Sequence, residues 1–149
     1  MKTIFAQLRQ TRKNMLAFYE KNKEKAFVLP EGFENCLYWN LAHCVVTQQL
    51  LHYKLSGNEM LVDQEVVDKY RKGTIFDGNA PSFKEVDRIK DLALITVDQL
   101  EKDYEIGLFK NYNEYPTSFN ITLMSIEDAL SFNLIHEGLH LGYMMAMVK

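Results

Sequence analysis

The sequence contains few cysteines and prolines. Of 149 residues, two are cysteine and three are proline. Cys36 and Cys44 fall eight positions apart on one predicted helix, about 12 Å along its axis, which is beyond the reach of a disulfide within one chain. We therefore expect two free thiols that serve as small core residues, and we expect the protein to be cytoplasmic.

Signals for export and for membrane insertion are also missing. The first fifteen residues, MKTIFAQLRQTRKNM, contain no unbroken apolar segment of the kind that a secretory signal needs. No apolar run approaches the ~20 residues of a membrane-spanning helix. We expect neither a secreted protein nor a membrane protein.

The sequence has no excess of basic residues. It carries 17 lysines and arginines against 20 acidic residues, a formal net charge of −3 at pH 7. A nucleic-acid-binding protein needs a basic surface, so nucleic acid is not an expected partner. With 47% hydrophobic and 25% charged residues, the chain has the composition of an ordinary globular protein, and we expect one domain over residues 1–149.

Helical patterns dominate what is present. Apolar residues recur at helical spacing, and two serines are each followed by an acidic residue three positions later, which is typical of a helix start. The segment 108–124 contains Pro116 and only weak strand signals. We predict an all-α fold, a four-helix bundle with one short extra helix. The predicted helices cover residues 3–23, 34–55, 63–73 (the short one), 82–104 and 125 to the C-terminal region.

A metal-binding motif lies in the last predicted helix. Residues 136–140 read HEGLH, which fits the H-E-x-x-H pattern of zinc peptidases. Four positions on a helix place His136 and His140 on one face, about 6 Å apart along the axis, close enough to share one ion. A peptidase of this type takes a third ligand from downstream sequence, yet none of the nine residues after His140 is Asp, Glu, His or Cys.

The second predicted helix offers the remaining histidines. His43 and His52 are nine residues apart and so point to opposite helix faces, and only one of them can face the last helix. Apolar residues surround His43, whereas His52 has polar neighbours, so we expect His43 in the interior and His52 at the surface. The resulting three-histidine site would keep open coordination positions, as catalytic sites do. The alternative is a chance grouping of core histidines.

These motifs resemble the DinB/YfiT-like family of metal-dependent enzymes, which are four-helix bundles. The resemblance rests on LYWNLAHCVVTQQLLHYKLSG at residues 37–57 and on HEGLHLG at residues 136–142, and it extends over nearly the whole chain. It implies that His43, His136 and His140 ligate a divalent metal, zinc or nickel, and that the protein is a homodimer. Tyr143 departs from the family pattern, in which a polar amide often follows the glycine.

The family also suggests a reaction. Some relatives transfer a low-molecular-weight thiol, bacillithiol or mycothiol, to small electrophiles. We therefore expect a small-molecule substrate, and a metal-dependent thiol S-transferase is the first hypothesis. The second is a non-catalytic bundle, stress-related or scaffolding, that binds metal for stability or not at all. The third is a metal-dependent hydrolase that uses Glu137 as its catalytic base.

Five further side chains lie near the predicted ligands in sequence. For Glu137, the alternative to a catalytic base is a solvated or interhelical carboxylate. Asn40, Asn133 and Tyr143 each lie three positions from a ligand, where they would bond to an imidazole, bind substrate or simply pack. Trp39 lies four positions before His43, and we expect it in the core rather than at a substrate-stacking wall.

Overall fold

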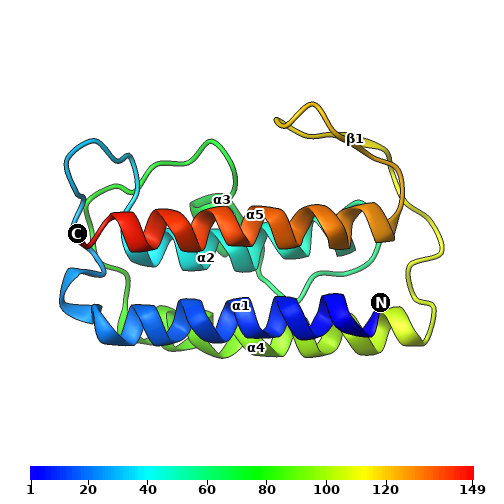
Figure 1. The fold of residues 1–149 in the computed structure, drawn as a ribbon, viewed down its shortest axis with the longest axis horizontal. Coiled ribbons are helices and arrows are strands. Elements are labelled where there is room, and N and C mark those ends of the chain that lie inside the picture. The colour runs from blue at the N-terminus through cyan, green and yellow to red at the C-terminus, as the bar shows by residue number, and fades with distance from the viewer.

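The computed structural model describes all 149 residues and is mostly helical. Four long helices form the bundle, and a short helix, α3, lies outside it (Figure 1). The all-α prediction is confirmed. The helices are α1 Lys2–Lys21, α2 Leu37–Gln49, α3 Gln64–Tyr70, α4 Phe83–Glu105 and α5 Ile126–Ala146, with a 3-10 turn at Lys23–Lys25 and a π-helical turn at Leu50–Lys54 that continues α2.

The four long helices form a closed ring of contacts. α1 packs against α4 and α5, and α2 packs against the same two helices, so α1 and α2 lie diagonally across the bundle. In Figure 1, α1 and α5 run in one direction and α2 and α4 in the other. None of these helices combines the length and the apolar character that a membrane-spanning helix needs.

Two helix starts follow from the predicted serine caps. The Ser82 hydroxyl accepts a hydrogen bond from the Glu85 amide at 3.2 Å, and the Ser125 hydroxyl accepts one from the Asp128 amide at 3.1 Å. Each bond satisfies one of the free amides of a helix N-terminus and fixes where the helix begins. Ser125 therefore determines where α5 begins.

The connection between α4 and α5 carries a small hairpin. Strand β1, Tyr115–Pro116, pairs in antiparallel fashion with β2, Thr122–Leu123. Asn120 in the turn has φ +57°, a left-handed conformation that asparagine tolerates better than most residues. The hairpin projects beyond α5 (Figure 1) and forms one wall of the pocket described below.

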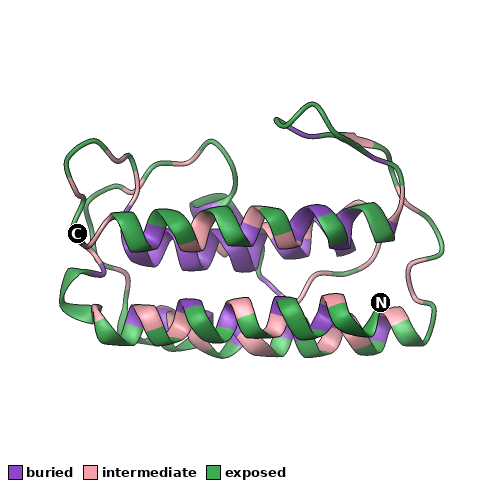
Figure 2. Ribbon diagram, viewed as in Figure 1, coloured by how far each residue is buried: buried purple, intermediate pink, exposed green.

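Helix α2 is the central element of the core. Almost all of its side chains are buried, because α1, α3, α4 and α5 all contact it (Figure 2). The predicted surface position of His52 is therefore wrong: this side chain is fully buried, and its Nδ1 lies 2.7 Å from the Gln48 carbonyl oxygen. Two residues on opposite faces of a helix lie one in the interior and one at the surface only when one face is exposed to solvent. Other helices cover α2 on all sides, so both His43 and His52 are buried.

The two cysteines are free and buried, as expected for core residues. Cys44 lies within α2, whereas Cys36 caps it, since its sulfur accepts a hydrogen bond from the Trp39 amide at 3.4 Å. Burial raises the pKa of the Cys36 thiol to about 11. The thiol is therefore protonated and unreactive at neutral pH.

Candidate metal centre

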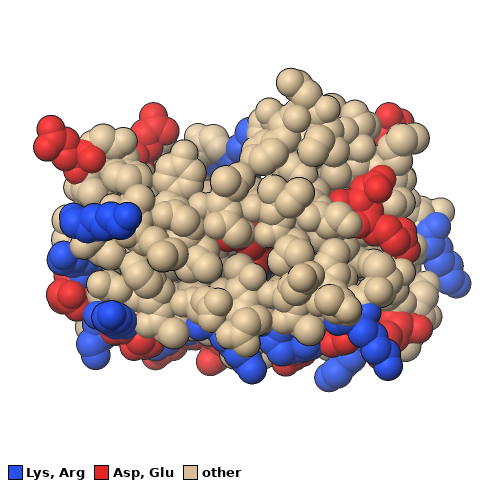
Figure 3. Space-filling model, viewed as in Figure 1, with Lys and Arg blue, Asp and Glu red and all other residues tan.

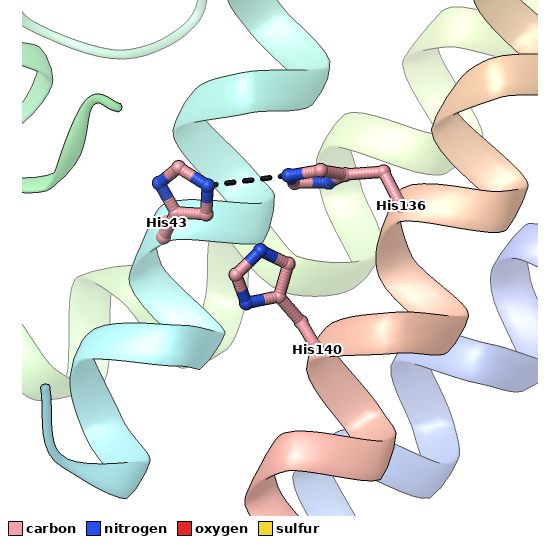
Figure 4. Close-up of side chains that lie close together, drawn as sticks. All are labelled: His43, His136 and His140. Atoms are coloured by element: carbon pink, nitrogen blue, oxygen red, sulfur yellow. Dashed lines mark hydrogen bonds between the residues drawn. The ribbon is translucent and has the colours of Figure 1, made fainter. Parts of the chain in front are cut away.

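Three histidines meet between α2 and α5. His43 comes from the middle of α2, and His136 and His140 lie one turn apart on α5. One nitrogen of each ring lies within 4.8 Å of the other two, and Nε2 of His43 is 3.2 Å from Nε2 of His136. Figure 4 shows the three rings turned toward a common point between the helices. The structure thus brings together the three predicted ligands.

Hydrogen bonds behind two of the rings determine where their protons are. Nδ1 of His43 lies 2.6 Å from the Tyr70 carbonyl oxygen, and Nδ1 of His140 lies 2.7 Å from Oδ1 of Asn40. The Asn40 amide is oriented by its own donation to the Cys36 carbonyl oxygen at 2.9 Å. Both oxygens can only accept, so both Nδ1 atoms carry the hydrogen. Nε2 of each ring therefore presents an unprotonated lone pair to the cluster.

Burial keeps all three imidazoles neutral. The pKa of His136 is lowered to about 2, mainly by desolvation and to a smaller extent by the neighbouring His140 and His43. The pKa of His140 is lowered to about 3, mainly by desolvation and to a smaller extent by His43. Desolvation also lowers the pKa of His43. A neutral imidazole is the form that binds metal, so no proton has to leave before an ion binds at neutral pH.

The cluster therefore fits a divalent ion. It offers three neutral nitrogen donors, and two of the rings are held from behind by an oxygen acceptor, as metal-ligating histidines usually are. His136 differs, because its Nδ1 is buried without a hydrogen-bond partner. No oxygen acceptor therefore holds His136 from behind, and its one hydrogen-bond contact is from Nε2 to Nε2 of His43 at 3.2 Å.

A pocket of about 380 Å³ opens beside the histidines. Its size is within the range of small-molecule sites. Phe132 and Tyr143 of α5 and Phe119 of the hairpin form apolar walls, and Thr47 of α2 places its hydroxyl 3.3 Å from Nε2 of His43. An ion held by the histidines would therefore be reached from this pocket.

A comparison with known families agrees with this architecture. The DinB superfamily matches residues 3–144, which is nearly the whole chain and includes all three histidines. The chain belongs to the DinB superfamily. The predicted resemblance is thereby confirmed. No protein among those with curated functions matches the sequence.

Within this DinB bundle, three of the residues near the histidines support the cluster or border the pocket. Asn40 accepts a hydrogen bond from His140, which is the first of the three roles predicted for it, a bond to an imidazole. Trp39 is buried and stacks on the His43 ring, with centroids 4.5 Å apart and an interplanar angle of 11°. Tyr143 is half-exposed at the edge of the pocket. Asn40 and Trp39 therefore hold ligand rings, whereas Tyr143 faces the space that a substrate would occupy.

Glu137 and Asn133 belong to a different network, in the bundle core. The Glu137 carboxylate is fully buried and accepts two hydrogen bonds from Arg12 and one from Asn133, all at 2.8 Å. Glu137 does not line the pocket. A general base must reach water or substrate, so this position matches an interhelical carboxylate and offers no contact for base catalysis. Asn133 likewise orients Glu137, and it makes no hydrogen bond to an imidazole.

Sequence reasoning missed Arg12, although the sequence contained a signal for it. Arg12 lies on the apolar face of α1, four positions after Leu8 and three before Met15, where a charge requires a buried partner. Its guanidinium contacts Glu137 of α5 and the carbonyl oxygens of Cys44 in α2 and Ala93 in α4. One side chain of α1 thus connects all four bundle helices.

Proposed function

We propose that this protein is a cytoplasmic enzyme that binds one zinc or nickel ion at His43, His136 and His140. Its reaction is the transfer of a low-molecular-weight thiol to a small electrophile. The observation that supports this most directly is the convergence of three neutral histidines beside an open pocket. DinB superfamily membership agrees with a metal-associated function.

The residues around the cluster suit such a reaction. A bound divalent ion supplies Lewis acidity, which lowers the pKa of a thiol so that it reacts as the thiolate near neutral pH. Tyr70 and Asn40 fix the tautomers of His43 and His140, and Trp39 holds the His43 ring by stacking. The aromatic walls favour substrates with an apolar or aromatic body.

The Thr47 hydroxyl provides a polar contact at the reacting end of the pocket. It lies beside Nε2 of His43, whose lone pair is its present partner. If that lone pair were donated to an ion, the hydroxyl would lose its acceptor and be free to bond to substrate. Thr47 would then orient a polar atom of the substrate next to the histidines.

The main rival is a bundle in which metal serves only stability. A structural zinc site is usually four-coordinate and closed. Here only three protein ligands converge, and a pocket of about 380 Å³ adjoins them. Both features favour a site with exchangeable positions, and hence catalysis.

Elemental analysis of the untagged protein tests the metal site. We expect about one zinc or nickel ion per chain in the wild type and none in His43→Ala or His136→Ala. His52→Gln is the matched control, since it removes a buried histidine outside the cluster, and it should retain the metal. Circular dichroism establishes that each variant is folded. A wild type that binds no metal after reconstitution would contradict the proposal.

Turnover is the second test. Metal-loaded protein is assayed with thiols, bacillithiol and mycothiol among them, against a panel of small electrophiles, and thiol consumption is followed. Activity that requires metal and is lost in His136→Ala supports the transferase. A full complement of metal with no turnover, together with a lower melting temperature on metal removal, would favour the stability role.

We also propose that two copies associate through the outer face of α5. Between residues 129 and 148 the only charged side chain is Glu137, which is buried. Ile135 and Met145 are half-exposed on this helix, and Figure 3 shows a broad uncharged surface there. Such a face suits a homodimer interface. Light scattering should give twice the chain mass for the wild type and a monomer for Ile135→Lys.

A further inference from the structure

The pocket beside the histidines contains one full charge. Apart from the neutral histidines, its lining residues are apolar, hydroxylic or aromatic, and Lys72 is the single exception. No aspartate or glutamate lines the pocket, and Lys72 takes part in none of the ion pairs of the chain. An ammonium group without a counter-charge beside an apolar cavity attracts an anion.

Lys72 is held in place by the same segment that orients a ligand ring. It lies in the turn after α3, two residues from Tyr70, whose carbonyl oxygen accepts the His43 hydrogen bond at 2.6 Å. The Tyr70 hydroxyl also donates to the Glu85 carboxylate of α4. Gly73, with φ +88°, provides the left-handed residue that ends this turn. The backbone at Lys72 therefore has a defined place relative to the histidines, and its exposed side chain lines the pocket from there.

Aromatic side chains form other walls of the pocket. Phe119 of the hairpin meets Phe132 of α5 edge-on, with ring centroids 5.4 Å apart, and Phe132 is followed along α5 by His136. Tyr115 and Tyr143 add further aromatic surface. A molecule in this pocket would place an apolar or aromatic body against these rings and have its charged group within reach of the lysine.

We propose that Lys72 is a specificity-determining residue, and that the pocket takes a small molecule with an aromatic or apolar body and one carboxylate. One lysine balances one unit of negative charge, which matches a carboxylate better than a dianionic phosphate. This inference rests on the proposed function, since it assigns the substrate class of the same pocket. In a thiol transfer, the carboxylate of the substrate would pair with Lys72 at a distance from the atoms that react. This pairing would orient the reacting atoms of the substrate toward the histidines.

The test is a binding measurement on the full chain, metal-free and zinc-loaded, by isothermal titration calorimetry. The probes are 4-phenylbutyrate, the neutral 4-phenylbutanol and the cationic 4-phenylbutylamine. We expect the wild type to bind the carboxylate about twofold to fivefold more tightly than the alcohol, as an ion pair with an exposed lysine allows, and the amine least tightly. The metal-free form matters because its histidines offer the carboxylate no ion to bind.

Three variants determine whether Lys72 carries this preference. In Lys72→Met the preference for the carboxylate over the alcohol should disappear, while affinity for the alcohol stays unchanged. Lys72→Arg should retain the preference. Lys13→Met, which removes an exposed lysine of α1 outside the pocket, should behave as the wild type.

Several results would overturn the inference. These are equal affinity for carboxylate and alcohol in the wild type, an unchanged preference in Lys72→Met, or no binding of any probe at millimolar concentration. Failure of the proposed function would look different, because a chain that binds no metal can still show the Lys72-dependent preference. Conversely, a metal-loaded and active enzyme without that preference would refute only the substrate class.

Discussion

Asn40 carries the hydrogen bond that orients His140. Its Oδ1 accepts from Nδ1 at 2.7 Å, which leaves Nε2 free as the donor atom. Loss of such a partner typically weakens metal binding by about tenfold to a hundredfold. We predict this loss for Asn40→Ala, measured by competition with a chromophoric chelator. Asn40→Asp keeps an oxygen acceptor and should retain most of the affinity; equal affinities in all three proteins would contradict the prediction.

His52 gives the protein a dependence of stability on pH. Desolvation is the main cause that lowers its pKa to about 4 in the folded chain, against 6.5 as the ordinary value. The unfolded chain therefore binds more protons between these two pH values, and stability must fall as the pH falls from 6.5 toward 4. Above pH 6.5 this contribution is fully present. The predicted loss from His52 is about 3 kcal/mol.

Urea unfolding at several pH values measures this loss. The metal-free wild type is compared with His52→Gln, so that the contribution of the other histidines cancels in the difference. The difference in free energy of unfolding between the two proteins should change by about 3 kcal/mol between pH 7 and pH 4. A difference that does not depend on pH would show that His52 titrates normally in the fold.

At the scale of elements, one buried ion pair joins the first and last helices. Arg12 of α1 and Glu137 of α5 are both fully buried and lie 2.8 Å apart. Removing one partner leaves an uncompensated buried charge, so Arg12→Met should cost about 3–5 kcal/mol of unfolding free energy. The double variant Arg12→Met/Glu137→Met should recover much of this loss. Urea unfolding distinguishes the cases, and a double variant no more stable than the single one would contradict the prediction.

The start of a helix was predictable from the sequence where a serine caps it. Ser82 and Ser125 each bond to the amide three positions on, as the capping pattern indicates. The second helix was predicted from residue 34 but begins at Leu37, because the cap is the sulfur of Cys36, a residue type outside the usual caps. The π-helical turn at Leu50–Lys54 was also missed, since its spacing departs from the 3.6-residue period.

At the scale of the whole molecule, the histidine cluster links α2 to α5. An ion that binds only the folded chain stabilises it by mass action. With free zinc at about 100 times the dissociation constant, the gain should be about 2.7 kcal/mol. Thermal melts with and without zinc test this prediction. His136→Ala should show no gain, and a gain of equal size in that variant would place the zinc elsewhere.

The three histidines of the cluster could be predicted from the sequence, but the side chains and helices around them could not. The i,i+4 spacing on α5 and the motif on α2 were sufficient to select His43, His136 and His140. The partnership of Arg12 with Glu137 spans 125 positions, and no local pattern in one sequence records such a pairing. The burial of His52 was missed for a related reason, because it depends on how many helices surround α2.

The separation of the histidines along the chain also determines when the centre can form during synthesis. His43 and His136 are 93 positions apart. A nascent chain at the ribosome exposes His43 long before α5 has been made, so its donor set is incomplete until residues through His140 have emerged and α5 has docked on α2. A complete set of three histidines is therefore available to an ion only late in biogenesis, after the bundle has closed.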